Sequence, residues 1–238
     1  MNRIARFSTD CGTGPLPHPA THLEYAVGGR VGERAGAAWK RALSRVFKCT
    51  LSVPIAAVFL SACGSAVQSE PPLAGAAIGG PYTLTDQNGR TVRDSDFKGK
   101  WQIVYFGYSF CPDVCPTDLQ HIGQALRLLE KKNPPLAAKV TPIFITVDPE
   151  RDTPAALKQY VANFHPRMLG LTGGVDAIAK VAKEFAIYYQ KEPIKDGTYA
   201  VNHSRQSYLM DPEGKPVALL PSEQSGEAVA SEIEKWVK

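Results

Sequence analysis

Along residues 81–238, continuous apolar runs alternate with stretches in which apolar residues recur at helical spacing. This pattern predicts strands that alternate with helices. Aromatic and β-branched runs at 101–108, 140–147 and 169–172 predict short buried strands. Apolar positions at helical spacing, with proline or threonine near several starts, predict helices between and after these strands. The predicted helices cover residues 116–131, 153–164, 175–186 and 225–237.

Turn residues add two hairpins to this pattern. The predicted hairpins join residues 82–85 to 91–92 through Asn88-Gly89, and residues 207–210 to 217–220 through Asp211-Pro212-Glu213-Gly214. Residues 187–206 are expected to be an extended insertion before the antiparallel strands. The resulting order resembles that of the thioredoxin family. We therefore expect an α/β, thioredoxin-like fold with an N-terminal β-hairpin, a parallel half and an antiparallel edge.

Residues 1–62 are predicted to be an N-terminal extension and a lipoprotein signal peptide. A basic stretch precedes an apolar run at 51–60. This run is too short for a bilayer, which takes roughly 20 residues, and it suits a secretory signal. It ends in Leu60-Ser61-Ala62-Cys63, which resembles the bacterial lipobox. We expect lipid attachment at Cys63 and a membrane-anchored lipoprotein on the bacterial periplasmic side; a plain signal peptide or an uncleaved anchor is the alternative.

The segments on either side of this signal have no predicted fold. Residues 1–40 show no sustained apolar period and are long for a stretch ahead of a signal, so we expect the natural start downstream, near Leu43 or Val46. Residues 63–80 are rich in serine, proline, glycine and alanine, which is typical of a flexible tether. Residues 81–238 are then expected to form one domain.

Charge and cysteine content reduce the number of functional classes that fit the chain. The 238 residues carry a net charge of +4, with much of the basic excess before residue 50. No later basic run is interleaved with aromatic residues, so nucleic-acid binding gains no support. The chain has five cysteines, too few in the predicted domain for a disulfide scaffold. Only Cys111 and Cys115 lie close together, which suggests chemistry at one place.

The cysteine pair lies where a predicted strand ends and a helix begins. Cys111 and Cys115 are four residues apart, so they share a helix face or flank its first turn. The helix N-terminus favours thiolates, which both metal binding and disulfide exchange require. Soft thiolates favour Cu(I), with zinc as a competitor. An inert buried pair and a structural disulfide are the plainer alternatives, and the spacing alone does not separate copper binding from redox work.

One of three histidines in the predicted domain can complete such a site. His121 points away from Cys115 on the helix, at about 100° per residue, and His165 ends a helix that returns to the opposite edge of the sheet. His203 precedes the strand at Ser207, which starts at the cysteine edge if it runs antiparallel to the others. His203 is therefore the preferred third ligand.

Residues 80–238 resemble the Sco/SenC family through several motifs in order. These are Tyr105-Phe106-Gly107-Tyr108, Cys111-Pro112-Asp113-Val114-Cys115-Pro116, Asp148-Pro149-Glu150-Arg151-Asp152-Thr153-Pro154, Phe164-His165-Pro166-Arg167 with Gly170-Leu171-Thr172-Gly173, and Val201-Asn202-His203-Ser204. The resemblance implies copper, as Cu(I) or Cu(II), on Cys111, Cys115 and His203. It also implies a partner, the Cu(A)-bearing subunit of cytochrome c oxidase, and allows other copper carriers.

Two further residues are tentative neighbours of the ligands. The family commonly has aspartate where this chain has Asn202, a change that removes a charge beside His203. Asp148 opens a loop expected at the same sheet edge, where it either contacts the site or only caps a helix.

The competing functions are a thiol–disulfide oxidoreductase that uses Cys111 and Cys115, and a peroxidase. The peroxidase family usually has threonine where this chain has Tyr108.

Overall fold

The structure is a computed structural model that describes residues 70–194 and 197–238. The predicted extension, signal segment and lipidation site at Cys63 lie outside these residues. Within the described ranges, no helix has the length and apolar character needed to cross a membrane.

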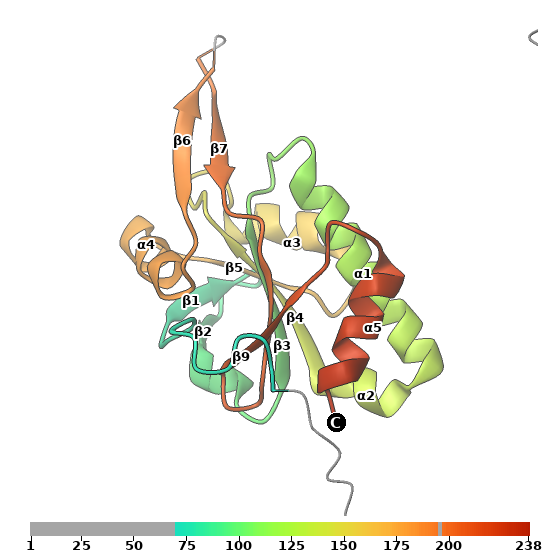
Figure 1. The fold of residues 1–238 in the computed structure, drawn as a ribbon. Coiled ribbons are helices and arrows are strands. Elements are labelled where there is room, and N and C mark those ends of the chain that lie inside the picture. Colours follow the sequence, from blue (N-terminus) through green and yellow to red (C-terminus); the bar gives the residue numbers. More distant parts are fainter. Residues whose placement is uncertain (1–69, 195–196) are drawn as a thin grey trace, which may run out of the picture. The chain divides into compact units, whose positions relative to one another are not determined.

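A seven-stranded sheet in the order β2-β1-β5-β4-β3-β8-β9 forms the centre of the domain (Figure 1). Its middle strands β3, β4 and β5 are parallel, while β1 and β8 flank them in antiparallel orientation. The α/β, thioredoxin-like expectation is confirmed, with antiparallel strands on both sides of the parallel centre. The strands of this sheet are β1 (Thr83–Asp86), β2 (Thr91–Arg93), β3 (Trp101–Gly107), β4 (Val140–Thr146), β5 (Leu169–Thr172), β8 (Ser207–Met210) and β9 (Pro216–Leu220).

Helices follow the parallel strands, as the spacing of apolar residues predicts. The longest, α1 (Val114–Lys132), begins just after β3 and lies beside α5 (Gly226–Trp236) (Figure 1). Most of its apolar positions are buried because they form one face toward the core. The remaining helical elements are η1 (Asp94–Phe97), α2 (Pro134–Lys139), α3 (Pro154–Ala162) and α4 (Val175–Glu184).

The segment after α1 differs from the expectation that Asn133 and two prolines only end the helix. Asn133 ends α1, and its side-chain oxygen accepts a hydrogen bond from the backbone N–H of Leu136. Pro134 then occupies the first turn of α2, where a missing N–H costs nothing. The same residues therefore stop one helix and start the next.

The insertion at 187–206 is more regular than expected. It contains β6 (Tyr189–Pro193) and β7 (Tyr199–His203), which pair antiparallel as a separate two-stranded sheet. This hairpin projects from the body of the domain (Figure 1). Four of the five residues of β6 are exposed, so this strand lacks the apolar alternation that marks a half-buried strand. Register places Tyr189 opposite His203 at its base.

The described part of the predicted tether packs against the domain. The backbone N–H of Leu73 donates to the Val217 carbonyl at 3.1 Å, and that of Gly79 donates to the Glu184 carbonyl at 2.8 Å. Leu73 and Ile78 pack against the apolar core. The segment at 73–79 is therefore held against the domain by backbone hydrogen bonds and apolar contacts.

Candidate metal centre

The two cysteines lie in the turn from β3 into α1. Cys111 is half-buried in the loop, and Cys115 is buried in the first turn of the helix. Asp113, the residue before α1, makes no side-chain capping hydrogen bond. The Cys115 backbone N–H instead points at Cys111 Sγ, 3.5 Å away. A first-turn N–H that has no partner within the helix therefore faces the Cys111 sulfur and favours its thiolate.

His203 ends β7 and directs its ring at the cysteines. Its Nε2 lies 3.1 Å from Cys115 Sγ. Its Nδ1 lies 2.7 Å from the Ser204 carbonyl oxygen, to which only a protonated Nδ1 can donate. In the neutral ring, this contact leaves Nε2 unprotonated with its lone pair toward the sulfurs, as a metal-ligating histidine requires.

The donor set fits a soft metal ion. One sulfur from each of Cys111 and Cys115 and one nitrogen of His203 lie within 4.8 Å of one another. Within residues 70–194 and 197–238, this is the group of histidine, cysteine or acidic residues close enough to hold a metal. Two thiolates and an imidazole suit Cu(I), with zinc as the competing ion. Three protein ligands leave a coordination position open.

The two thiols differ in acidity. Hydrogen bonding to Cys115 lowers the pKa of Cys111, against the opposing effect of partial burial. The same contact with Cys111, together with burial, raises the pKa of Cys115. The metal-free site therefore presents a thiolate at the more exposed sulfur and keeps the proton at the buried one.

Gly107 makes room for the buried sulfur. A Cβ atom at this position would lie 2.9 Å from Cys115 Sγ and 3.0 Å from Cε2 of Phe144. Real Cβ atoms do not approach other atoms so closely, so a larger residue would displace Cys115 or the aromatic ring. The glycine in the motif ahead of the cysteines thus has a steric role at the site.

The other two histidines lie elsewhere. His121 Nδ1 is 2.7 Å from the Ser222 carbonyl oxygen. His165 is buried beside Glu130, 3.4 Å away, and accepts a hydrogen bond from the Arg167 backbone N–H. The structure brings His203 to the cysteines and leaves these two histidines in structural contacts.

The two tentative neighbours do not touch the ligand atoms. Asn202 donates to Glu192 on the facing strand at 2.6 Å, so its side chain supports the hairpin. The Asp148 carboxylate is fully buried and accepts from the hydroxyl of Tyr199 at 2.8 Å and from the guanidinium of Arg151. Asp148 therefore acts on the hairpin through these two partners.

Arg151 joins three segments around the site, and its motif gave no specific signal for this role. The Arg151 guanidinium carbon lies 3.9 Å from the ring centre of Tyr199, 4.8 Å from that of Phe110 and 5.5 Å from that of Tyr108. It also donates to the Tyr199 carbonyl oxygen at 3.0 Å. The cation therefore links the cysteine loop, the 148–154 loop and the hairpin that carries the histidine.

Asp152 holds the loop that carries Cys111 in place through hydrogen bonds. Its carboxylate accepts from the Ser109 backbone N–H at 3.0 Å and from the Thr146 hydroxyl at 2.6 Å. Burial raises the pKa of Asp152 against the lowering effect of these hydrogen bonds. The loop between β3 and α1 is thus tied to the end of β4.

Comparison with known proteins gives a consistent result. The SCO1/SenC family model matches residues 70–238. The mitochondrial SCO2 homolog of Bos taurus is 42% identical over 162 residues, covering 67% of this chain and 60% of that protein. The mitochondrial SCO1 of Saccharomyces cerevisiae is 40% identical over 164 residues, covering 68% and 55% respectively. The chain spans 43% to 60% of the length of the first curated relatives.

Solved structures agree with these relatives. ScoI of Bradyrhizobium japonicum with copper bound is 46% identical, with a TM-score of 0.62, covering 67% of this chain and 99% of that one. Yeast Sco1 with copper bound is 40% identical, with a TM-score of 0.62, covering 68% and 88%. The family model covers more than half of the chain. The chain therefore belongs to the SCO1/SenC family.

Proposed function

We propose that this protein binds copper through Cys111, Cys115 and His203 and takes part in assembling the Cu(A) site of cytochrome c oxidase. The observation that carries the proposal is the convergence of two sulfurs and one imidazole nitrogen within 4.8 Å. Relatives 46% and 40% identical to this chain were solved with copper bound, which supports copper over zinc as the ion. Copper is here the cargo that the protein receives and passes on.

The arrangement suits transfer by ligand exchange. Cys115 is buried, whereas Cys111 is half-buried and Phe110 beside it is 59% exposed. A partner thiolate can approach from the exposed side and enter the open coordination position. Copper then moves to the partner as bonds to Cys111, Cys115 and His203 are replaced, with no net change in its oxidation state.

Thiol reduction is the second function that a specific observation favours. The lowered pKa of Cys111 prepares it to attack a disulfide of a target protein. The attack forms a mixed disulfide and releases one target thiolate. Cys115, once deprotonated, then attacks Cys111, which releases the second target thiolate and leaves Cys111 and Cys115 oxidised. The target gains the two electrons that the cysteine pair loses.

An anaerobic Cu(I) titration of a protein comprising residues 64–238 tests the proposal. We expect about one equivalent to bind, since the three ligands form a single site. Replacing His203 by alanine should weaken this binding while leaving the rate of disulfide reduction unchanged. His165→Ala is the matched control, because that ring is buried beside Glu130. Undiminished copper binding in His203→Ala would reject the ligand set.

We also propose that Cys63 carries a lipid and holds the domain at the periplasmic face of a bacterial membrane. On this proposal residues 1–62 are extension and signal, residues 63–80 connect anchor and domain, and residues 81–238 hold the copper site. The support is the lipobox-like Leu60-Ser61-Ala62-Cys63 after the apolar run. Labelled fatty acid should enter the wild-type protein and not Cys63→Ser; equal labelling of both would refute the assignment.

A further inference from the structure

An ion pair between a buried carboxylate and an exposed arginine lies beside the candidate metal centre. Asp118, on α1, has a side chain with 0% exposure. Arg205 donates to both of its oxygens, from Nε to Oδ2 and from Nη2 to Oδ1, each at 2.7 Å. The hydroxyl of Tyr105 donates to Oδ2 as well, at 3.0 Å. Such a two-point contact fixes both partners in distance and orientation.

The pair joins the two segments that carry the ligands. Asp118 lies three residues after Cys115 on the same helix, and Arg205 lies two residues after His203. Between His203 and Arg205, the Ser204 carbonyl accepts from Nδ1 of the imidazole at 2.7 Å. An Arg205 held in place therefore also holds the carbonyl that orients the ring.

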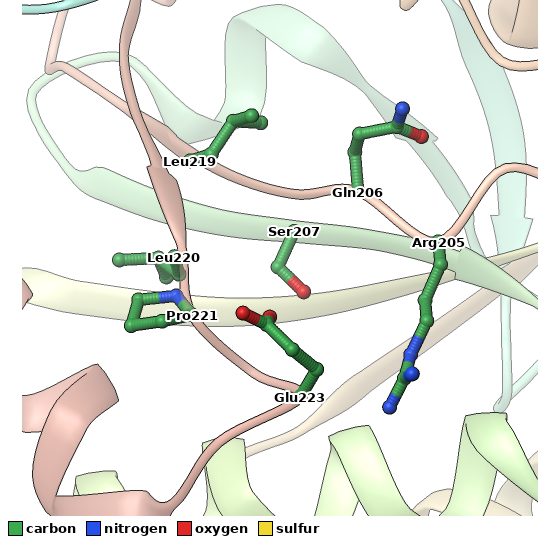
Figure 2. A pocket seen from close by; sticks show the side chains of 7 residues that line it. All are labelled: Arg205, Gln206, Ser207, Leu219, Leu220, Pro221 and Glu223. Carbon is green, nitrogen blue, oxygen red and sulfur yellow. The ribbon is translucent and has the colours of Figure 1, made fainter.

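The surface beside Arg205 is hollowed. A pocket of about 440 Å³ is lined by Arg205, Gln206, Ser207, Leu219, Leu220, Pro221 and Glu223. In Figure 2 the Arg205 side chain extends away from that of Gln206, toward the helices in the lower part of the view. This segment borders open space on the pocket side, and the contact with Asp118 ties it to α1.

The hairpin that carries His203 needs such a fixing point. In the described residues, β6 and β7 form their own sheet and share no ladder with the central one. At the hairpin base, Ser204 exchanges hydrogen bonds with Tyr188, whose backbone N–H donates to Ser204 Oγ at 3.0 Å. These bonds close the hairpin on itself. Contacts from outside the hairpin then set the distance between His203 and the cysteines. One lies at Tyr199, which Arg151 and Asp148 hold. The other lies next to His203 itself, where Arg205 contacts Asp118.

We propose that Arg205 and Asp118 are positioning residues that hold His203 against Cys115. The proposal rests on the copper site proposed above and deepens it. Loss of the two-point contact should free the Ser204–Arg205 segment, so that the imidazole samples positions away from the sulfurs. Copper binding would then lose the contribution of His203 while both cysteines stay in place.

The test compares Arg205→Lys and Arg205→Gln with wild type in a protein comprising residues 64–238. Lysine keeps the charge but cannot make the two-point contact. Arg205→Lys therefore still tests the proposal if Arg205→Gln folds poorly. Arg167→Lys is the matched control, because Arg167 pairs with Glu130 at 2.9 Å at the opposite end of β4, where it also donates to the Val140 carbonyl. Cu(I) affinity is measured by competition with a chelator.

We expect the Arg205 variants to lose about tenfold or more in affinity, the effect typical of losing an outer partner of a metal ligand. Arg167→Lys should match wild type. In a His203→Ala background, Arg205→Lys should cause no further loss, because Arg205 acts through that ring. An equal loss in both backgrounds, or no loss in either Arg205 variant, would overturn the proposal.

A second readout does not need copper. The ring signals of His203 in NMR spectra of the metal-free protein should be sharp in wild type and Arg167→Lys, and broadened or doubled in the Arg205 variants. Unchanged ring signals in the Arg205 variants would contradict the positioning role. If wild type failed to bind copper, the proposed function would fall while these ring signals still decided the role of Arg205.

Discussion

Cys115→Ser is expected to lower the affinity for Cu(I) by more than about 100-fold. This loss exceeds the one expected when a residue that only hydrogen-bonds to a metal ligand is removed. Serine occupies nearly the same space above Gly107, so the fold should persist. Hydroxyl oxygen is a hard ligand that a soft ion does not favour. Chelator competition measures the affinity, and circular dichroism checks the fold.

The same variant also separates the two cysteines. Because Cys111 carries the lowered pKa, it should still attack a target disulfide and then remain trapped in the mixed disulfide, since Cys115 is absent. Cys111→Ser, the matched partner, should trap far less. Equal trapping by both variants, seen on non-reducing gels, would contradict the assigned roles of the two sulfurs.

Arg151→Ala is expected to lower stability by about 3–5 kcal/mol, because it leaves the fully buried Asp148 carboxylate without its cation. For a domain of this size, that corresponds to a melting temperature lower by roughly 10 °C. Copper affinity should fall as well, since Arg151 links the cysteine loop to Tyr199 on the hairpin. Thermal unfolding and chelator competition measure the two effects.

Lys191→Ala is the control for the Arg151 variant. Lys191 also lies on the hairpin and pairs with Glu150, but both side chains are largely exposed. An exposed pair contributes between about 0 and 1 kcal/mol, so this variant should melt close to wild type. A melting temperature for Arg151→Ala no lower than that of Lys191→Ala would show that Arg151 does not support Asp148.

The sequence is sufficient to predict those site residues whose positions are set by regular strands and helices. Cys111 and Cys115 follow a buried strand that the apolar run predicts, and β8 pairs antiparallel with β3, with Tyr105 opposite Ser207. This pairing starts β8 at the cysteine edge, which is why the sequence alone favours His203 over the other two histidines. Asn202 and Asp148, the two tentative neighbours of the ligands, contact residues of the hairpin in the structure.

The contacts that hold the site together were beyond sequence reasoning. Asp118 shares a helix face with Cys115, but an acidic residue in an amphipathic helix gives no sign that it is buried. Arg205 and Arg151 reach partners far along the chain, and such pairs follow from tertiary packing. The β6–β7 hairpin was missed because its exposed residues carry little apolar pattern.

X-ray absorption at the copper edge tests the ligand set most directly. The Cu(I)-loaded protein comprising residues 64–238 should show scattering from two sulfur atoms and from one imidazole, those of Cys111, Cys115 and His203. The imidazole signal should disappear in His203→Ala and persist in His165→Ala. An imidazole signal unchanged in His203→Ala, or copper held without sulfur in the wild-type protein, would contradict the account.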